Sequence, residues 1–407
     1  TCAFIESAKK EAIDNILDVA WLKKNKGLKA IIVTGCLAER YREEIFTELP
    51  EVDALLGVGS IHHIAEAVES VVKRLSNKKV PKYASFDDKN GVRLGGDRVL
   101  TTPEFFSYLK VAEGCDNRCT YCAIPAIRGR YRSRPMEELV NEAKDLESLG
   151  VKELNVIAQD VTRYGKDLYG SYRLHELLRR ITEETSIPWL RILYCYPDKI
   201  TDELIAELRD NDRVLKYIDL PLQHIADPVL KRMNRHGDSK MIRDVLAKLR
   251  REVPGIVIRT TFIVGFPGET EEDFEELCRF VEEQRFEHMG VFTYSPEEGT
   301  PAATMDGQID EQTKQDRMDI LMKLQMQINA EQNEEKIGKT IRVLTEDYDP
   351  VSEAHFGRSA ADAPDIDGKV YFKSARRVAP GTMIDVKIRE AVDYDLFGRA
   401  VLSKEEK

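Results

Sequence analysis

The sequence predicts an α/β protein in three parts: a truncated N-terminal doubly wound parallel-sheet domain, a central incomplete six-unit (βα) TIM-like barrel, and a small C-terminal antiparallel β-barrel. Strand-like and helix-like runs alternate over residues 1–75 and again over 101–334, which indicates parallel sheets covered by helices. Over residues 335–403, short runs of alternating hydrophobicity follow one another without helices. The polar stretch 76–100 is expected to be a linker.

The composition favours a cytoplasmic protein without a membrane partner. Charged residues make up 33% of the 407 residues, and the chain has neither an apolar run of membrane-spanning length nor a signal-peptide pattern. The net charge of −11 argues against binding of nucleic acid by the overall field of the protein. Seven cysteines, three of them clustered, favour metal ligation in a reducing compartment over a disulfide framework.

The N-terminal domain is expected to begin with an amphipathic helix over residues 6–25, followed by a strand over 28–35. A helix over 37–49, a strand over 52–59 and a helix over 61–75 complete it. Ligands of parallel sheets bind beyond the carboxyl ends of the strands, where Cys36 is expected to lie. Cys2 precedes the first helix in a comparable way, so both thiols are expected at one edge of the sheet.

The central domain contains six apolar, strand-like runs, each followed by a helical pattern. They cover residues 105–114, 151–160, 189–197, 214–223, 256–265 and 287–295. Repetition of this unit predicts a curved parallel sheet with its chemistry in the loops after the strands. The last helix, over 311–336, carries a stripe of methionines, which we interpret as core packing rather than a groove for a partner.

The C-x-x-x-C-x-x-C motif formed by Cys115, Cys119 and Cys122 follows the first of these strands. Three thiolates can hold an iron–sulfur cluster and leave one iron open. An open iron can chelate the amino and carboxylate groups of S-adenosylmethionine, and an electron from the cluster can then split the sulfonium. A zinc site and three unrelated core cysteines are the alternatives. Zinc usually takes four ligands, and the sequence has no second C-x-x-C pair to supply them.

Polar residues are expected at the rim of the barrel, where they would bind this cofactor. Gln159, Gln223, Arg191 and Arg259 follow or end the predicted strands, and an arginine there could pair with the methionine carboxylate. Gly265, in the segment RTTFIVGFPGET, lets the backbone approach a ligand closely. The alternative for each polar residue is an ordinary solvated loop side chain or a satisfied core group.

The remaining cysteines and one basic run are ambiguous from the residues alone. Cys2 and Cys36 stand at helix starts, where backbone amides favour the thiolate that metals need, although buried structural cysteines are the alternative. Cys195 and Cys278 have no such setting and are interpreted as structural. Residues 127–134 contain four arginines, which form either a solvated face or a docking site for an acidic segment or RNA.

Several motifs resemble the methylthiotransferase family of radical S-adenosylmethionine enzymes, over nearly the whole chain. They are TCAFIESAK, GCLAERY, EGCDNRCTYCAIPAIRGRYRSR, LPLQHIADPVLKRMNR, RTTFIVGFPGETEEDF and APDIDG. The closest likeness is to the branch that modifies an aspartate of small-subunit ribosomal protein twelve. The resemblance implies that the C-terminal barrel is a TRAM domain and that two 4Fe-4S clusters and S-adenosylmethionine are the cofactors.

The resemblance also implies roles for individual residues. Cys115, Cys119 and Cys122 would hold the catalytic cluster, and Tyr121 would lie near the adenine. Cys2 and Cys36 would hold two irons of an auxiliary cluster. A third auxiliary cysteine is implied on a strand upstream of Cys2, so the chain is expected to be a fragment.

The expected reaction adds a methylthio group to the β-carbon of an aspartate in ribosomal protein twelve, on the assembled or assembling ribosome, with a flavodoxin or ferredoxin as reductant. The alternatives are a tRNA adenosine methylthiotransferase and a non-catalytic iron–sulfur sensor. Residues 336–407 carry 13 basic and 13 acidic side chains. A neutral terminal barrel is a weak phosphate binder, which disfavours tRNA.

Overall fold

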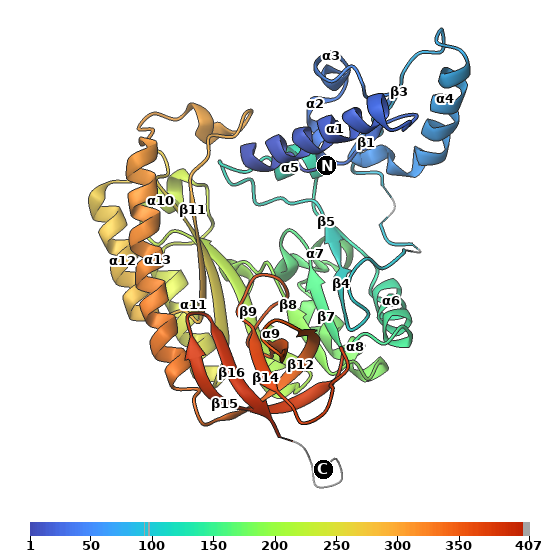
Figure 1. Ribbon diagram of the computed structural model, residues 1–407. Coiled ribbons are helices and arrows are strands. Elements are labelled where there is room, and N and C mark those ends of the chain that lie inside the picture. The colour runs from blue at the N-terminus through green and yellow to red at the C-terminus, as the bar shows by residue number, and fades with distance from the viewer. Residues whose placement is uncertain (93, 97, 402–407) are drawn as a thin grey trace. The chain divides into compact units, whose positions relative to one another are not determined.

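The computed structural model describes residues 1–92, 94–96 and 98–401 (Figure 1). These residues divide into two compact units. The first comprises Thr1–Gly95, Glu113–Arg132 and Ser295–Met305, and the second comprises the other described residues. The cysteine loop, which the sequence places in the barrel domain, therefore packs with the N-terminal residues. No helix in the described part of the chain is long and apolar enough to cross a membrane.

The first unit is built on a three-stranded sheet in the order β1-β2-β3, with all neighbours parallel. Its strands are β1 Ile32–Thr34, β2 Ala54–Leu56 and β3 Tyr83–Ser85. The parallel sheet confirms the prediction, but β3 lies within the expected linker, which is therefore wrong for residues 83–85. Every residue of β3 is half-buried, so the strand has no hydrophobic alternation that a sequence pattern could reveal.

The helices of this unit follow the predicted order with one break. Helix α1 (Glu6–Asn25) occupies the predicted range, and its Ala12 and Ile16 pack on the sheet core. The helix predicted over 37–49 is instead two helices, α2 (Cys36–Tyr41) and α3 (Glu44–Glu48). The backbone of Arg42 between them has φ +47°, which a right-handed helix cannot accommodate. The other helices are η1 (Val58–His63), α4 (Ile64–Ser76), α5 (Ile124–Arg128) and η4 (Pro301–Thr304).

The second unit contains the predicted six-stranded parallel sheet, in the order β11-β10-β9-β8-β7-β4 (Figure 1). The six-unit prediction is confirmed, and the carboxyl ends of all six strands share one edge. The strands are β4 Phe106–Lys110, β7 Glu153–Ile157, β8 Trp189–Ile192, β9 Val214–Gln223, β10 Val257–Val264 and β11 His288–Thr293. Two short strands, β5 (Ala112–Glu113) and β6 (Arg132–Ser133), pair with each other.

Helices connect these strands, and α12 and α13 lie side by side near β11 (Figure 1). The helical segments are α6 Met136–Ser148, η2 Val161–Arg163, α7 Lys166–Tyr169, α8 Leu174–Glu184, η3 Pro197–Lys199, α9 Asp202–Asp210, α10 Asp227–Arg232, α11 Ser239–Glu252, α12 Glu271–Gln284 and α13 Glu311–Glu334. Helix α12 begins with a capping box in which Thr270 and Asp273 bond each other's backbone amides.

The buried face of α13 is largely polar, although Leu321 and Ile328 are buried in it and Met318 and Met322 are half-buried. Met326 is 47% exposed. Three buried amides instead donate to backbone carbonyls: Gln325 to Phe286, Asn329 to Glu287, and Asn333 to Asp393. Side-chain hydrogen bonds therefore supply much of the contact between α13 and these backbone segments.

The C-terminal region is a closed five-stranded barrel in the order β12-β13-β14-β16-β15. The strands are β12 Thr340–Asp349, β13 Ala354–Ser359, β14 Val370–Lys373, β15 Met383–Val392 and β16 Asp395–Ala400. The barrel is antiparallel as predicted, except that β14 and β16 pair in parallel. Strand β13 was not predicted, and the predicted boundary at residue 403 lies outside the described residues.

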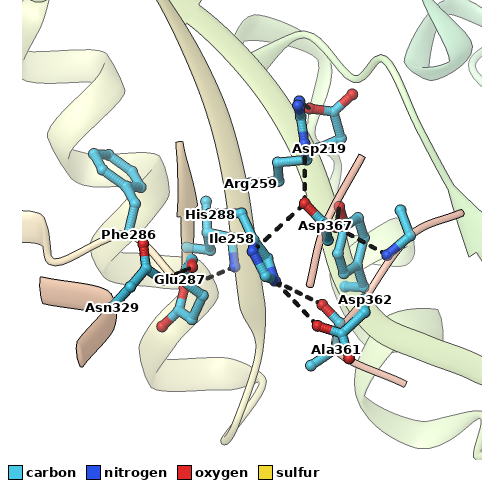
Figure 2. A network of polar contacts seen from close by, with 12 residues as sticks. Asp219, Ile258, Arg259, Phe286, Glu287, His288, Asn329, Ala361, Asp362 and Asp367 are labelled. Carbon is cyan, nitrogen blue, oxygen red and sulfur yellow. Dashed lines mark hydrogen bonds and ion pairs between the residues drawn. The ribbon is translucent and has the colours of Figure 1, made fainter. Parts of the chain in front are cut away.

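The loop after β13 inserts acidic groups among residues from the early parts of the sheet strands (Figure 2). Asp367 lies 3.4 Å from Arg259 and 3.4 Å from His288, and the Tyr217 hydroxyl donates to it at 2.7 Å. Beside this network, the fully buried carboxylate of Glu153 lies 2.6 Å from the Arg358 guanidinium of β13. Leu344 and Ala363 join the same apolar core as Trp189. The C-terminal barrel is therefore fixed to the sheet by buried ion pairs and apolar packing together.

Replacing Arg358 with Ala is expected to lower the free energy of unfolding by about 3–5 kcal/mol, because the substitution leaves Glu153 buried with one cation fewer. Chemical unfolding followed by the fluorescence of the buried Trp189 measures the change.

Arg342→Ala is the matched control, because Arg342 belongs to the same barrel and pairs with Asp385 on the surface at 3.0 Å. The control should change stability by less than about 1 kcal/mol. Equal effects of the two substitutions would contradict a special role for the buried pair.

Candidate functional site

The loop that carries the cysteine motif is held in shape by its own backbone. Gly114 has φ +78°, and a Cβ there would lie 2.1 Å from the Arg130 carbonyl oxygen, so only glycine fits. The Cys115 amide donates to the Gly129 carbonyl at 3.2 Å, and the Cys122 amide donates to the Cys119 carbonyl at 3.1 Å. The loop is therefore closed on itself before any ligand is considered.

The three motif cysteines belong to this one closed loop and are largely shielded from solvent. Cys115 and Cys119 are buried, whereas Cys122 is intermediate in exposure. Tyr121, the predicted neighbour of the adenine, is half-buried. Sulfur is the donor that iron–sulfur clusters require, so the chemistry of this donor set fits a cluster.

Arg128 joins the cysteine loop to the N-terminal sheet. Its guanidinium donates to the Glu113 carboxylate at 3.0 Å and lies 3.3 Å from the Cys36 sulfur. Burial alone would lower the pKa of Arg128, but Glu113 and Cys36 outweigh burial and raise that pKa above its ordinary value. Cys36 also packs against Ala123 and Ile127 of α5. Two cysteine sets far apart in sequence thus lie in one compact unit.

The structure brings Cys2 close to Cys36 through the backbone. The Cys36 amide donates to the carbonyl of Thr1 at 3.1 Å. Gly35 permits this approach: its φ is +103°, and a Cβ there would lie 3.1 Å from the Thr1 carbonyl oxygen. Cys2 is exposed and Cys36 is buried at the start of α2, in agreement with their predicted place at one edge of the sheet.

The other two cysteines have the properties of unreactive thiols. Burial, with a smaller contribution from Asp219, raises the pKa of the Cys195 thiol well above its usual value. Burial also raises the pKa of Cys278, to about 11. Both thiols therefore stay protonated at neutral pH, which agrees with the structural role expected of them.

Two predicted cofactor ligands of the second unit have unsatisfied acceptor atoms at the carboxyl edge of the sheet. The side-chain oxygens of Gln159 and Gln223 are buried and have no hydrogen-bond partner among the described residues. Gln223 also has φ +74°, a strained conformation for a residue with a side chain. Buried acceptors without partners are costly, so this edge fits a ligand that carries hydroxyl or ammonium donors.

Gly265 forms a tight turn directly after β10. It has φ +70°, and a Cβ there would lie 2.2 Å from Cγ of Lys314. The carboxylate of Glu269 accepts from the amides of Gly265 and Phe266. Its other oxygen lies 3.7 Å from the fully buried His224 ring, which follows Gln223. Glu269 therefore links the two turns that carry the predicted cofactor ligands Gly265 and Gln223.

The two arginines proposed from sequence as cofactor ligands are engaged elsewhere. Arg191 is fully buried and donates to Glu153 at 2.8 Å and to the Ala360 carbonyl at 3.0 Å. Arg259 donates to Asp219 at 3.3 Å, as Figure 2 shows. Burial raises the pKa of Asp219, and the nearby Arg259 opposes that rise. Both guanidinium groups serve the junction with the C-terminal barrel.

Three family models match this chain, and together they cover its three parts. The model of the uncharacterized protein family UPF0004 matches residues 1–57, the radical SAM superfamily matches 109–281, and the TRAM domain matches 337–401. Curated relatives match over nearly the whole of this chain. A ribosomal protein uS12 methylthiotransferase RimO from Desulforamulus reducens is 50% identical over 400 residues, which are 98% of this chain and 89% of that protein.

The chain belongs to the RimO family. A second RimO, from Thermoanaerobacter sp., is 48% identical over 398 residues, with coverage of 98% and 89%. The family assignment confirms the resemblance seen in the motifs and makes the chain a radical SAM methylthiotransferase. Among solved structures, the cobalamin-dependent S-adenosylmethionine radical enzyme OxsB aligns with 78% of this chain and 46% of its own, at 15% identity and a TM-score of 0.48.

Sequence reasoning missed two groups that the structure places beside the predicted site residues. In the sequence, Arg128 is one of four arginines in residues 127–134, and no pattern there indicates its contact with the Cys36 sulfur. Glu269 lies in the quoted GFPGET motif, but no pattern indicated that its carboxylate holds the Gly265 turn. A buried acid directly after a glycine turn was the available signal.

Substitution of Gly265 by Ala is expected to destabilise the protein by more than the roughly 1–2 kcal/mol that a left-handed backbone alone costs an L-residue, because the new Cβ displaces Lys314. Gly255→Ala is the matched control: Gly255 has φ +79° and nothing within 4 Å of its Cβ position. Thermal unfolding midpoints of both variants compare the two costs. If the Gly265 variant is no less stable than the Gly255 variant, the turn can accommodate a Cβ next to Lys314 and the prediction is wrong.

Proposed function

We propose that this chain adds a methylthio group to the β-carbon of an aspartate in ribosomal protein uS12. The names of its relatives support the substrate, and their near-complete coverage supports transfer of the activity. The contact of Arg128 with the Cys36 sulfur carries the proposal, because it joins a second cysteine site to the segment that follows the C-x-x-x-C-x-x-C motif. A transfer of sulfur needs both a radical site and a place to hold the sulfur.

The cofactors we propose are S-adenosylmethionine and two 4Fe-4S clusters. Cys115, Cys119 and Cys122 would hold the catalytic cluster, and Cys2 and Cys36 would hold two irons of the auxiliary one. When bound by these cysteines, the catalytic cluster would supply the electron for reductive cleavage of S-adenosylmethionine, which would provide the radical that abstracts hydrogen from the substrate carbon. Arg128 then holds a positive charge beside the Cys36 sulfur, where a ligand thiolate carries negative charge.

The remaining residues would orient S-adenosylmethionine. The unsatisfied oxygens of Gln159 and Gln223 would accept from its ammonium or ribose hydroxyl groups. The turn at Gly265 would let the backbone approach the adenine closely, and the ring of Tyr121 is proposed as a further neighbour of the adenine. Arg191 and Arg259 fit this role less well, because their guanidinium groups already pair with Glu153 and Asp219.

The partners we propose are uS12, on the assembled or assembling ribosome, and a flavodoxin-like or ferredoxin-like reductant, in the cytoplasm. The balanced charge of the C-terminal barrel disfavours tRNA as the substrate. One observation favours the tRNA alternative. Phe356, Tyr371 and Phe397 form a row across three neighbouring strands, with ring centroids 5.9 and 5.2 Å apart, and such rows can stack unpaired bases.

The decisive experiment is anaerobic turnover of the cluster-reconstituted protein with S-adenosylmethionine and reductant. Purified uS12 and tRNA are offered separately, and a methylthio gain is read by mass spectrometry. We expect the gain on the uS12 aspartate. Cys122→Ala should abolish it, whereas Cys278→Ser should retain it, because Cys278 is a half-buried thiol on α12 outside either cysteine set.

A gain on tRNA adenosine alone would transfer the function to the alternative. Release of 5′-deoxyadenosine without either product would keep the radical chemistry and remove the proposed substrates. Cluster binding without 5′-deoxyadenosine would favour a non-catalytic sensor.

Arg128→Met is expected to lower the iron content of the protein at the Cys36 site, because the variant removes the positive charge that faces that sulfur. Iron per chain and the electron paramagnetic resonance of the reduced clusters measure the loss. Arg130→Met is the matched control, since Arg130 is exposed and two residues away. Full iron content in the Arg128 variant would show that the guanidinium has no part in holding a cluster.

A further inference from the structure

Two adjacent histidines and one aspartate converge in the first unit, apart from both cysteine sets. His62 and His63 end the 3₁₀-helix η1, and Asp87 follows β3. One potential ligand atom from each residue lies within 4.8 Å of the other two. None of the three belongs to the motifs that support the methylthiotransferase assignment.

The distances between these atoms suit a small divalent ion. The Asp87 carboxylate oxygen lies 2.8 Å from Nε2 of His63 and 3.7 Å from Nε2 of His62. Ligands about 2.0–2.1 Å from a tetrahedral zinc ion lie roughly 3.3–3.4 Å from one another, which falls between the two values. The two imidazole rings lie side by side, with centroids 4.0 Å apart, so both can face one ion.

The groups behind the triad are those that accompany a metal ligand. A histidine that binds a metal through one nitrogen usually bonds a carboxylate through the other. Nδ1 of His63 lies 3.0 Å from the Glu66 carboxylate, which in turn accepts from the Tyr83 hydroxyl at 3.2 Å. The contact of Glu66 with Nδ1 therefore fixes the orientation of the His63 ring and leaves Nε2 available to a metal ion.

Asp87 is held in place through its backbone. Its amide donates to the hydroxyl of Ser60 at 2.7 Å, and Ser60 is fully buried. Gly59 makes this approach possible, because a Cβ there would lie 2.2 Å from the Asp87 carbonyl oxygen. The aspartate is thus positioned by the same short helix that carries the histidines.

We propose that His62, His63 and Asp87 bind a divalent transition-metal ion of the Zn²⁺ class, with Glu66 as the outer carboxylate. Two imidazoles and one carboxylate are a ligand set that such ions prefer over Ca²⁺ or Mg²⁺. The partial exposure of the side chains leaves a fourth position for water. The site stands whether or not the proposed methylthio transfer is correct.

The bound ion would be structural, because it would fix the segment that supports the cysteine loop. Two residues after Asp87, Lys89 donates to the Ala126 carbonyl of α5. The Asn90 side chain accepts from the Arg130 amide at 2.9 Å. A metal at Asp87 would therefore anchor the contacts of residues 87–90 with the loop that carries Cys115, Cys119 and Cys122.

Co²⁺ titration of the cluster-reconstituted full chain tests the site, since Co²⁺ replaces Zn²⁺ and reports its ligands in the visible spectrum. We expect one equivalent with weak ligand-field bands, no thiolate charge-transfer band, and displacement by Zn²⁺. His63→Ala and Asp87→Asn should each lose this equivalent. Glu66→Gln should weaken it by about 10–100-fold, as loss of an outer carboxylate does.

His236→Ala is the matched control, because His236 is an exposed histidine of the second unit and should keep the equivalent. Circular dichroism without metal verifies that each variant folds, as expected for partly exposed side chains. Absence of the equivalent from the unaltered protein, its persistence in His63→Ala, or a thiolate band at the same stoichiometry would each overturn the proposal. Methylthio transfer is not the readout, so failure here leaves the proposed function untouched.

Discussion

The buried carboxylate of Glu153 determines much of the second unit. It is fully inaccessible and lies against two guanidinium groups, Arg191 from the neighbouring strand and Arg358 from the C-terminal barrel. A buried anion is tolerated only when cations and hydrogen bonds surround it, so the three residues must be placed together. This requirement fixes the TRAM barrel against the early parts of the sheet strands. It also commits the guanidinium of Arg191 to this junction.

The carboxyl edge of the sheet carries both neutral and ionisable groups. Gln159 and Gln223 have unsatisfied amide oxygens there, and Nε2 of His224 and Oε1 of Glu269 are likewise buried without a hydrogen-bond partner among the described residues. At the opposite end of the strands, Asp367 meets Arg259 and His288 at the junction with the C-terminal barrel (Figure 2). The early parts of the sheet strands thus attach the C-terminal barrel.

The fold was predictable wherever a periodic pattern repeated. Six strand–helix units require a parallel sheet, and the glycine before Cys115 marks the tight turn of the cysteine loop. Strand β3 was missed because all three of its residues are half-buried and show no alternation. The partners of the arginines could not be predicted for a different reason. The partner of Arg191 at the Ala360 carbonyl is 169 residues away, and no local pattern encodes such a contact. Arg128 and Cys36 present the same difficulty over 92 residues.

The buried polar face of helix α13 specifies the position of the helix along its axis, which an apolar face would specify less strictly. Gln325, Asn329 and Asn333 are spaced by four residues, and each donates to a different backbone carbonyl. A helix with an apolar buried face can shift along its axis by one turn and replace one aliphatic contact with another. This helix cannot, because a shift would strand all three amides at once. The three hydrogen bonds therefore fix the position of α13 along its own axis relative to both the sheet and the C-terminal barrel, so one inserted residue would break the alignment with both.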